Sequence, residues 1–347
     1  MFICGIGTAV PSTRYHQADC WEALEHSKHF SELNPRSRAI LKKVLLGKNG
    51  ISTRHLALEN LEDAFQILPD VLHARFLKNA PQLASEAAIH ALEKAKTSVR
   101  EISAIIVSTC TGYLCPGLTS YVSERLGLNP STLGLDLVGQ GCGAAIPNLL
   151  TAESLVASGH HKVLSICVEV CSAAFYLDND PGVLISACLF GDGAAAAVLS
   201  DKPVSHQRAI HWKKSASILC PGDRDLLRFE IRNGLLRNIL APEVPSRAAE
   251  HAATVFESFG ILQSSITTWI LHAGGRDVLL ALRDKLALGE ADICWSARVL
   301  SEFGNISSPF ALFVLDAAFE RGAPGGKWWM ATFGAGFSSH GALLEVE

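Results

Sequence analysis

The chain has 347 residues, of which 48% are hydrophobic and 18% charged, a composition typical of a globular protein with one large core or two fused halves. Its formal net charge of −4 argues against general binding to nucleic acids or membrane surfaces. The ten cysteines form no CxxC pair and have no histidine cluster at zinc spacing, so we expect reduced thiols and no structural metal site.

The chain begins with "MFICGIGTAVPST", which predicts a first strand followed by a turn. This stretch has no basic lead and is interrupted by Gly5, Gly7 and Pro11, features that argue against a signal peptide. No uninterrupted apolar run is long enough to cross a bilayer. We therefore expect a cytoplasmic protein without a membrane span.

Two strand-like runs, "AIIVSTCTG" at 104–112 and "TTWILHAGG" at 267–275, end in similar turns. Their offset of 163 residues recurs elsewhere in the chain: it pairs Thr109 with His272, Cys142 with Asn305, and Gly159 with Gly322. The segments that follow Cys142 and Asn305 each predict an apolar helix that ends at a glycine. The chain therefore resembles an internal duplication.

Buried, β-branched strands that alternate with helices favour a layered α/β fold. We expect two similar halves joined near 200–207, with a first half at 1–203 that carries Cys142 and a second half at 204–347 that carries His272 and Asn305. A duplication places equivalent loops together across a pseudo-twofold axis, so these three residues should meet.

The three side chains make chemical sense together. A thiol at the start of a helix lies near the positive end of the helix dipole, which favours the thiolate, and a neighbouring histidine should lower the thiol pKa further. The histidine and the asparagine amide can donate hydrogen bonds to an oxyanion or enolate. Gly141 and Gly143 allow close approach of backbone and substrate.

Papain-like peptidases are a competing class, because they also order Cys, His and Asn along the chain, with the histidine 130–150 residues after the cysteine. Here the gap is 130 residues, and "QGCG" is similar to the sequence at the start of their active-site cysteine motif. However, Ala144, Ala145 and Ile146 stand where those enzymes continue with Ser-Cys-Trp. The duplication also has no counterpart in that fold, so the peptidase is a distant alternative.

The motifs "GQGCG", "LHAGGRDVL", "GNISSP", "LFGDGAAAAVL" and "FGAGF" together resemble the thiolase superfamily, and most closely the type III polyketide synthases of bacterial type. The resemblance covers nearly the whole chain. It implies a thiolase-like fold with two pseudo-twofold-related α/β halves in a five-layered αβαβα arrangement. It also implies repeated decarboxylative condensation of malonyl-coenzyme A onto an acyl-coenzyme A starter, followed by cyclisation to a pyrone or phenolic product.

The resemblance implies roles for individual residues. Cys142 would carry the acyl chain as a thioester, and His272 and Asn305 would stabilise the enolate. Phe190 would be a gatekeeper, and a second gatekeeper phenylalanine is replaced by Leu236 or Arg237. The implied substrate-binding residues are Phe190, Cys110, Thr111, Cys115, Cys171, Ala174, Leu236, Arg237, Phe333 and Gly334.

Coenzyme A thioesters would be the substrates, and no further cofactor or metal is implied. The segment 33–58 contains six basic residues and no acidic one, which suits phosphate groups. The implied coenzyme A-binding residues are Lys48, Lys42, Lys43, Arg54, Gly274 and Gly275. The loop 112–117, "GYLCPG", would cross a homodimer interface, with Cys115 near the partner's cavity and a cis bond before Pro116.

The sequence also departs from the family's plant members. Cys171 and Ala174 replace threonines, and Ala335 replaces a proline, which suggests a cavity unlike that of chalcone synthase. An initiating β-ketoacyl-ACP synthase, which takes substrate from an acyl carrier protein, is the alternative with the same three catalytic residue types. "HAGG" and "SSP" favour the polyketide synthase over that alternative.

Overall fold

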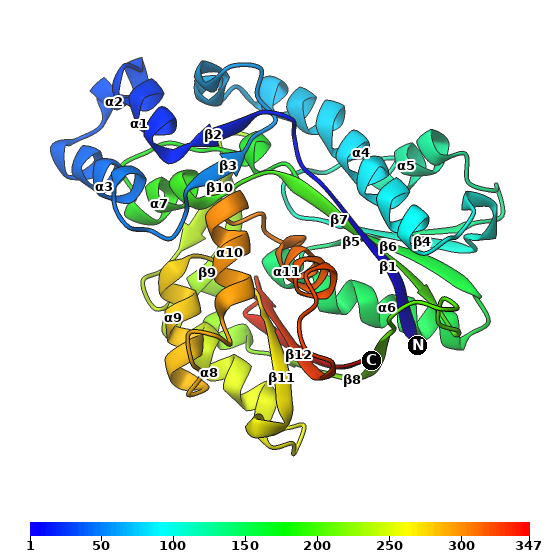
Figure 1. Ribbon diagram of the computed structural model, residues 1–347. Coiled ribbons are helices and arrows are strands. Elements are labelled where there is room, and N and C mark those ends of the chain that lie inside the picture. The colour runs from blue at the N-terminus through cyan, green and yellow to red at the C-terminus, as the bar shows by residue number, and fades with distance from the viewer.

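A computed structural model describes residues 1–347. Its main feature is one nine-stranded sheet with the strand order β11-β12-β13-β8-β1-β7-β6-β4-β5 (Figure 1). In chain order these strands are β1 (Phe2–Ala9), β4 (Ala104–Thr109), β5 (Leu133–Val138), β6 (Lys162–Glu169), β7 (Gly193–Ser200), β8 (Ile210–Leu219), β11 (Ile266–Leu271), β12 (Gly326–Gly334) and β13 (Ser338–Val346).

The sheet confirms the internal duplication. In the first half, β7 lies antiparallel between β1 and β6, and β4 is parallel to β6. In the second half, β13 lies antiparallel between β8 and β12, and β11 is parallel to β12. The halves join through a short antiparallel pairing of β1 with β8. The exact division at 203/204 stays a prediction.

Two helices lie between the halves and contact both. Helix α6 (Ala145–Ala157) contacts β4 and β6 as well as β12 and β13, and α11 (Phe310–Glu320) contacts β1 and β7 as well as β11 and β12. Both are apolar on most sides, as a helix buried between two sheets must be.

The outer layers are α4 (Pro69–Lys94), which packs on β1, β6 and β7, and α8 (Val244–Glu257), which packs on β8, β12 and β13. The result is the five-layered αβαβα arrangement expected from the resemblance (Figure 1). Its largest hydrophobic core runs through both halves, from Ile3 and Ile6 in β1 to Trp329 in β12, so the halves share one interior.

Several further segments lie outside the layers. They are β2 (Arg14–His16), α1 (Gln17–Glu25), α2 (Lys28–Glu32), α3 (Pro35–Leu46), β3 (Thr53–His55), α7 (Pro181–Leu189) and the hairpin of β9 (Leu227–Arg232) and β10 (Leu235–Leu240). Helix α7 contacts both α3 and β10. The remaining helices are α5 (Leu118–Leu126), α9 (Arg276–Lys285) and α10 (Cys294–Phe303).

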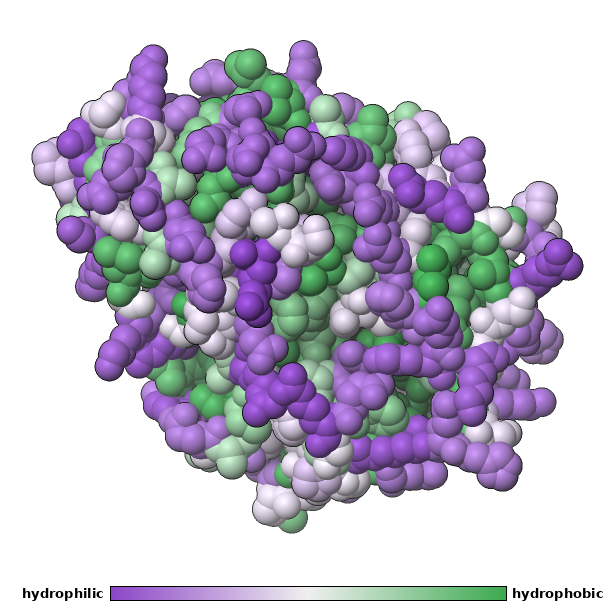
Figure 2. Space-filling model, turned by 45° about the horizontal axis from the view of Figure 1, so that its top comes forward, coloured by the Kyte–Doolittle hydropathy of each residue, from purple (hydrophilic) through white to green (hydrophobic).

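The face in Figure 2 is covered mainly by hydrophilic side chains, with hydrophobic patches between them. Scattered apolar residues are normal on a protein surface, because polar atoms cannot cover all of it. None of the helices combines the length and the apolar character that crossing a bilayer requires.

Candidate active site

Cys142 lies in a single turn of 3₁₀ helix, Gly141–Gly143, between β5 and α6. The geometry favours glycine on both sides of the cysteine. Gly141 has a φ of +55°, in the left-handed region, and a Cβ on Gly143 would lie 3.1 Å from the backbone nitrogen of Gly334. The end of β12 therefore packs directly against the turn that carries the thiol.

The thiol lines a mainly apolar cavity that is partly open to solvent, and its empty space, the open mouth included, is about 640 Å³. Five of the residues predicted to bind substrate line it as well: Cys110, Thr111, Cys171, Ala174 and Phe190. Its other walls come from α7, from the β9–β10 hairpin and from the segment that follows β6.

The other five predicted substrate-binding residues do not line this cavity: Cys115, Leu236, Arg237, Phe333 and Gly334. Phe333 and Gly334 lie behind the thiol turn, against Gly143. Leu236 lines a wider hollow that opens beside the cavity. Arg237 points into an ion-pair cluster, and Cys115 is exposed.

The cavity has a second phenylalanine that the sequence did not predict, at a position other than Leu236 or Arg237. Phe229 of β9 lines the cavity together with Phe190, and its cross-strand partner Asn238 of β10 lines it too. Leu236 and Arg237, which were predicted at the second gatekeeper position, lie on β10 instead. The "RFE" of β9 gives no local signal that its phenylalanine faces the thiol.

Asn305 is connected to Cys142 through Ser307. The Sγ of Cys142 lies 3.2 Å from the Ser307 hydroxyl, and the Ser307 backbone N–H donates to Asn305 Oδ1 at 2.9 Å. Asn305 Nδ2 in turn donates to the carbonyl of Gly274 at 3.0 Å. The three segments therefore meet, although Asn305 itself does not line the cavity.

Asn305 also fixes the backbone at Phe190. The Asn305 N–H donates to the Leu189 carbonyl at 2.8 Å, and the Gly191 N–H donates to the Asn305 carbonyl at 3.0 Å. This parallel bridge between Phe190 and Asn305 joins a cavity wall to the residue predicted to hold the enolate.

His272 follows β11 directly and is 1% exposed. Its ring packs edge-on against Phe310 and Phe333, with centroid distances of 5.2 and 4.9 Å. Neither ring nitrogen makes a hydrogen bond within the protein, which is uncommon for buried polar atoms. Burial lowers the pKa of His272 to about 3, so the imidazole is neutral at physiological pH.

The expected lowering of the thiol pKa is wrong. Burial raises the pKa of Cys142 to about 12, the hydrogen bond from Ser307 lowers it, and the nearby Glu169 carboxylate raises it. Desolvation of the buried thiol is the largest effect and was not foreseen, and the histidine that was expected to lower the pKa is neutral. The resting pair is therefore a thiol and a neutral imidazole.

Glu169 is a buried carboxylate that the sequence analysis did not identify. It is fully buried at the end of β6 and accepts hydrogen bonds from Thr111 Oγ1 at 2.9 Å, Ser308 Oγ at 2.5 Å and the Cys110 backbone N–H at 3.0 Å. Burial raises its pKa, and these donors lower it. The only signal was one acidic residue in the apolar run "VLSICVEV".

Arg54 does not bind coenzyme A from where it lies, because it is 3% exposed. Its Nη1 donates to the carbonyls of Ala187 at 2.8 Å and Phe190 at 2.9 Å, and its Nε donates to Gln17 Oε1 at 3.0 Å. This arginine therefore fixes the C-terminal end of α7 and the backbone of Phe190. The sequence does not distinguish the buried basic residues of segment 33–58 from the exposed ones, and only the fold does.

The three lysines of that segment, Lys42, Lys43 and Lys48, are exposed. Lys48 lies beside the start of α9, because its carbonyl accepts a hydrogen bond from Arg276 Nη1 at 2.8 Å. Gly275 precedes that helix and Gly274 is held by Asn305. The predicted coenzyme A residues other than Arg54 thus lie on α3, on the loop after it and at the start of α9.

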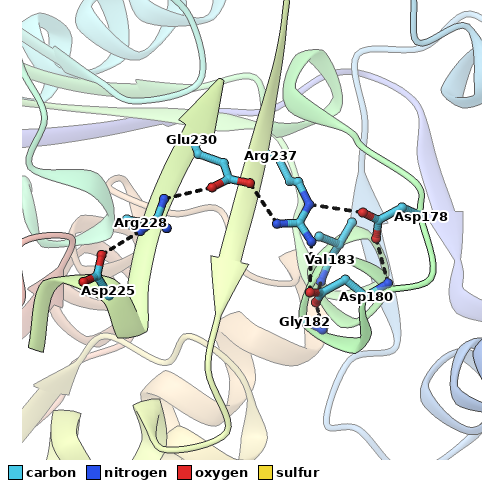
Figure 3. Close-up of polar contacts among 8 residues, drawn as sticks. All are labelled: Asp178, Asp180, Gly182, Val183, Asp225, Arg228, Glu230 and Arg237. Atoms are coloured by element: carbon cyan, nitrogen blue, oxygen red, sulfur yellow. Dashed lines mark hydrogen bonds and ion pairs between the residues drawn. The ribbon is translucent and has the colours of Figure 1, made fainter. Parts of the chain in front are cut away.

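Arg237 anchors the β9–β10 hairpin to α7 (Figure 3). Its guanidinium donates to Asp178 at 3.1 Å, Asp180 at 2.9 Å and Glu230 at 3.0 Å. Glu230 also accepts from Arg228, a cavity residue, at 3.1 Å. Asp180 is in addition the N-cap of α7. Two walls of the cavity are therefore joined by ion pairs outside it.

The loop 112–117 has the expected cis bond between Cys115 and Pro116. Cys115 is exposed, and Tyr113 is 72% exposed. The loop lies on the side of β5, which is the edge strand of the sheet and has exposed apolar side chains at Leu133 and Val138.

The chain is similar to known proteins over its whole length. The N-terminal domain of chalcone and stilbene synthases matches residues 1–203, and the C-terminal domain of the same enzymes matches residues 214–344. A 3,5-dihydroxyphenylacetyl-CoA synthase from Streptomyces toyocaensis is 29% identical over 361 residues, covering 99% of this chain and 89% of that protein.

Two solved structures illustrate the similarity in fold. The 1,3,6,8-tetrahydroxynaphthalene synthase of Streptomyces coelicolor A3(2) superposes with a TM-score of 0.88 at 23% identity, covering 99% of each chain. The PKS-I of the brown alga Ectocarpus siliculosus superposes with a TM-score of 0.91 at 25% identity, covering 99% of this chain and 97% of that one.

Proposed function

Because the chain belongs to the chalcone and stilbene synthase family and is a type III polyketide synthase, we propose that it extends an acyl-coenzyme A starter with malonyl-coenzyme A through a thioester on Cys142. This family membership decides against the peptidase and the β-ketoacyl-ACP synthase as the enzyme class. The starter, the number of extensions and the product are left to experiment.

In the loading step, the Cys142 sulfur attacks the acyl carbonyl of the starter, and the bond from that carbonyl to the coenzyme A sulfur breaks. The resting thiol is protonated, so its proton must leave as the bond forms. Neutral His272, with two unpaired ring nitrogens, is the base that suits this transfer, and it then protonates the departing coenzyme A thiolate.

In the extension step, malonyl-coenzyme A loses its carboxylate as carbon dioxide, and the electron pair of that bond becomes an enolate. His272 and the Asn305 amide donate hydrogen bonds to the enolate oxygen. An apolar cavity favours this step, because a charged carboxylate leaves as a neutral molecule. The enolate carbon attacks the thioester carbonyl, and the carbon–sulfur bond to Cys142 breaks, which releases Cys142 as a thiolate that can attack the next acyl thioester directly.

Coenzyme A would enter beside α9. Lys48 is exposed at the start of that helix, where unpaired backbone N–H groups and the helix dipole favour phosphate. Lys42 and Lys43 extend the positive surface along α3. The proposed reaction uses coenzyme A thioesters as substrates and needs no resident cofactor.

We also propose a homodimer that forms along β5. An edge strand with exposed apolar residues is a natural pairing surface, and the adjoining loop 112–117 exposes Tyr113. Val138→Lys should give monomers in sedimentation velocity experiments, whereas Leu262→Lys, at an even more exposed apolar residue elsewhere, should not. A wild-type monomer that is fully active would contradict the dimer.

We propose that the reaction takes place in the cytoplasm. All ten cysteines are free thiols, including Cys142, a state that reducing compartments maintain.

One observation carries the proposed function: Cys142 faces an apolar cavity and is hydrogen-bonded through Ser307 to Asn305. The test is incubation of the purified protein with malonyl-coenzyme A and a panel of acyl-coenzyme A starters, followed by mass spectrometry of the products and of the intact protein. A pyrone or phenolic product and an acyl adduct are expected. Both should vanish in Cys142→Ala and persist in Cys294→Ala, which removes an exposed thiol.

No adduct from any thioester would contradict the proposal. An adduct that forms only from an acyl carrier protein would revive the ketoacyl-ACP synthase. Asn305→Ala separates the steps, because it should still accept the starter on Cys142 but lose most of its malonyl-coenzyme A decarboxylation.

A further inference from the structure

A second cysteine–histidine–aspartate cluster lies at the end of β8, away from the cavity that Cys142 lines. The Sγ of Cys220 lies 3.7 Å from Nδ1 of His251, which belongs to α8. The other ring nitrogen of His251, Nε2, lies 2.9 Å from Oδ2 of Asp223. The motifs that indicate the family contain none of these three residues, and the proposed condensation does not use them.

The carboxylate of Asp223 determines which nitrogen of the imidazole carries the proton. Asp223 also has Arg247 Nε at 4.0 Å, and a charged carboxylate can only accept hydrogen bonds. His251 Nε2 must therefore carry the ring proton and donate to Asp223. Nδ1 is left with a lone pair that faces the Cys220 thiol, so the thiol is the donor of that contact. A thiol beside a base that a carboxylate holds in place is the arrangement that activates a nucleophile.

Backbone hydrogen bonds hold the cluster in this arrangement. The Cys220 N–H donates to the Phe337 carbonyl at 2.8 Å, and the Phe337 N–H donates to the Cys220 carbonyl at 3.3 Å. The Asp223 N–H donates to the same Cys220 carbonyl at 3.0 Å, which turns the chain back towards the histidine. The ring of His251 packs against that of Phe337, with a centroid distance of 5.4 Å. All three side chains of the cluster are therefore fixed by the end of the sheet and by α8.

Small molecules can reach the Cys220 thiol from solvent. Cys220 is partly exposed, and Pro221 and Gly222, which follow it, are exposed. None of the three main cavities is lined by a member of the cluster, so the thiol suits a small reagent and not an extended substrate. Cys142 differs, because burial raises its pKa to about 12 and keeps the resting thiol protonated. Cys220 is therefore the better target for a small electrophile.

We propose that Cys220 is a modification site, where hydrogen peroxide oxidises the thiol to a sulfenic acid and a low-molecular-weight thiol then forms a mixed disulfide. In the first step the sulfur attacks one peroxide oxygen, so a sulfur–oxygen bond forms and the oxygen–oxygen bond breaks. The thiol proton passes to Nδ1 of His251 and from there to the departing hydroxide, which leaves as water. In the second step the sulfur of the small thiol attacks the Cys220 sulfur, and the sulfur–oxygen bond breaks with loss of water.

The test treats the purified protein with hydrogen peroxide and glutathione at pH 7 and follows the mixed disulfide on each cysteine peptide by mass spectrometry. A sample without peroxide gives the blank. Cys220 should be modified before Cys142, and dithiothreitol should reverse the modification. Because a positioned base contributes about a hundredfold or more to a proton transfer, His251→Gln should slow the modification of Cys220 roughly tenfold or more. Cys294, an exposed thiol in the same sample, should react at the same rate in both proteins.

Asp223→Asn separates activation of the thiol from a structural role of the cluster. The new amide has the size of the carboxylate but can donate to Nε2, which moves the ring proton to Nδ1 and removes the base that faces Cys220. This variant should also slow the modification of Cys220. Asp225→Asn is the matched control, because it makes the same change in the same turn at a carboxylate that pairs with Arg228, and it should react like the wild type.

The inference is overturned if Cys220 is modified at equal rates in the wild type, His251→Gln and Asp223→Asn. It is also overturned if Cys220 in the wild type is modified no faster than Cys294. Neither result bears on the proposed condensation, which is measured separately through the acyl adduct on Cys142.

Discussion

The acidity of the Cys142 thiol should depend on a single hydroxyl, that of Ser307. This hydroxyl lies 3.2 Å from Sγ and is the side-chain hydrogen bond that lowers the pKa of Cys142 against the effect of burial. A hydrogen bond to a charged group contributes about 1.5–3 kcal/mol. Ser307→Ala should therefore raise the thiol pKa by about one to two units, at about 1.4 kcal/mol per unit.

The assay is the rate of alkylation of Cys142 by iodoacetamide as a function of pH, followed by peptide mass spectrometry. Only the thiolate reacts, so at a pH below the pKa each unit by which the pKa rises slows the reaction about tenfold. At pH 8 the variant should react roughly ten to a hundred times more slowly than the wild type. Cys294, which is exposed, provides an internal reference within the same sample.

Ser308→Ala is the matched control. It removes a neighbouring buried hydroxyl that donates to Glu169 and not to Cys142. Its effect on the alkylation of Cys142 should be much smaller. If Ser307→Ala and Ser308→Ala slow the reaction equally, or neither does, the hydrogen bond does not control the thiol and the reasoning fails.

Three further predictions follow from other parts of the structure. Arg237→Met leaves three carboxylates without their shared cation and should lower the thermal midpoint by a few degrees, whereas Lys43→Met, at an exposed lysine, should leave it unchanged. Lys48→Glu should raise the KM for acyl-coenzyme A roughly fivefold at low salt, with little change in kcat, and an unchanged KM would contradict its phosphate role. Burial lowers the pKa of His340 to about 4, below the value of about 6.5 for an unfolded histidine. Its contribution to stability is therefore complete above pH 6.5 and is lost as the pH falls towards 4. His340→Gln should reduce the loss of unfolding free energy between pH 7.5 and pH 4.5 by up to about 3 kcal/mol, as measured by urea titrations at the two pH values. Equal losses in the variant and the wild type would count against this.

The internal repeat made the fold and the meeting of the three segments predictable. It requires Cys142 and Asn305 to occupy equivalent positions, each before a central helix, and the structure has both there. The positions of buried strands and the lengths of helices follow from local hydrophobic patterns, and a single sequence is enough to show such patterns.

Contacts between distant segments were not predictable in the same way. Glu169 and Ser307 are 138 residues apart, and nothing local indicates that they meet beside the thiol. Arg54 has the same sequence signal as the lysines around it, and its burial depends on the pairing of β2 with β3 and on the position of α7. Desolvation of Cys142 likewise depends on how completely the cavity walls close, which no motif encodes.

The last strand of the chain, β13, lies inside the sheet between β12 and β8, and β8 pairs with β1. During synthesis, the whole of β13, up to residue 346, must therefore leave the ribosome before β8 and β12 can be joined in the sheet. Until then β8 and β12 each present an open edge, and such edges pair readily with other chains. A polypeptide shortened by its last nine residues would keep every candidate catalytic side chain, and we expect it to aggregate and be degraded before it could act.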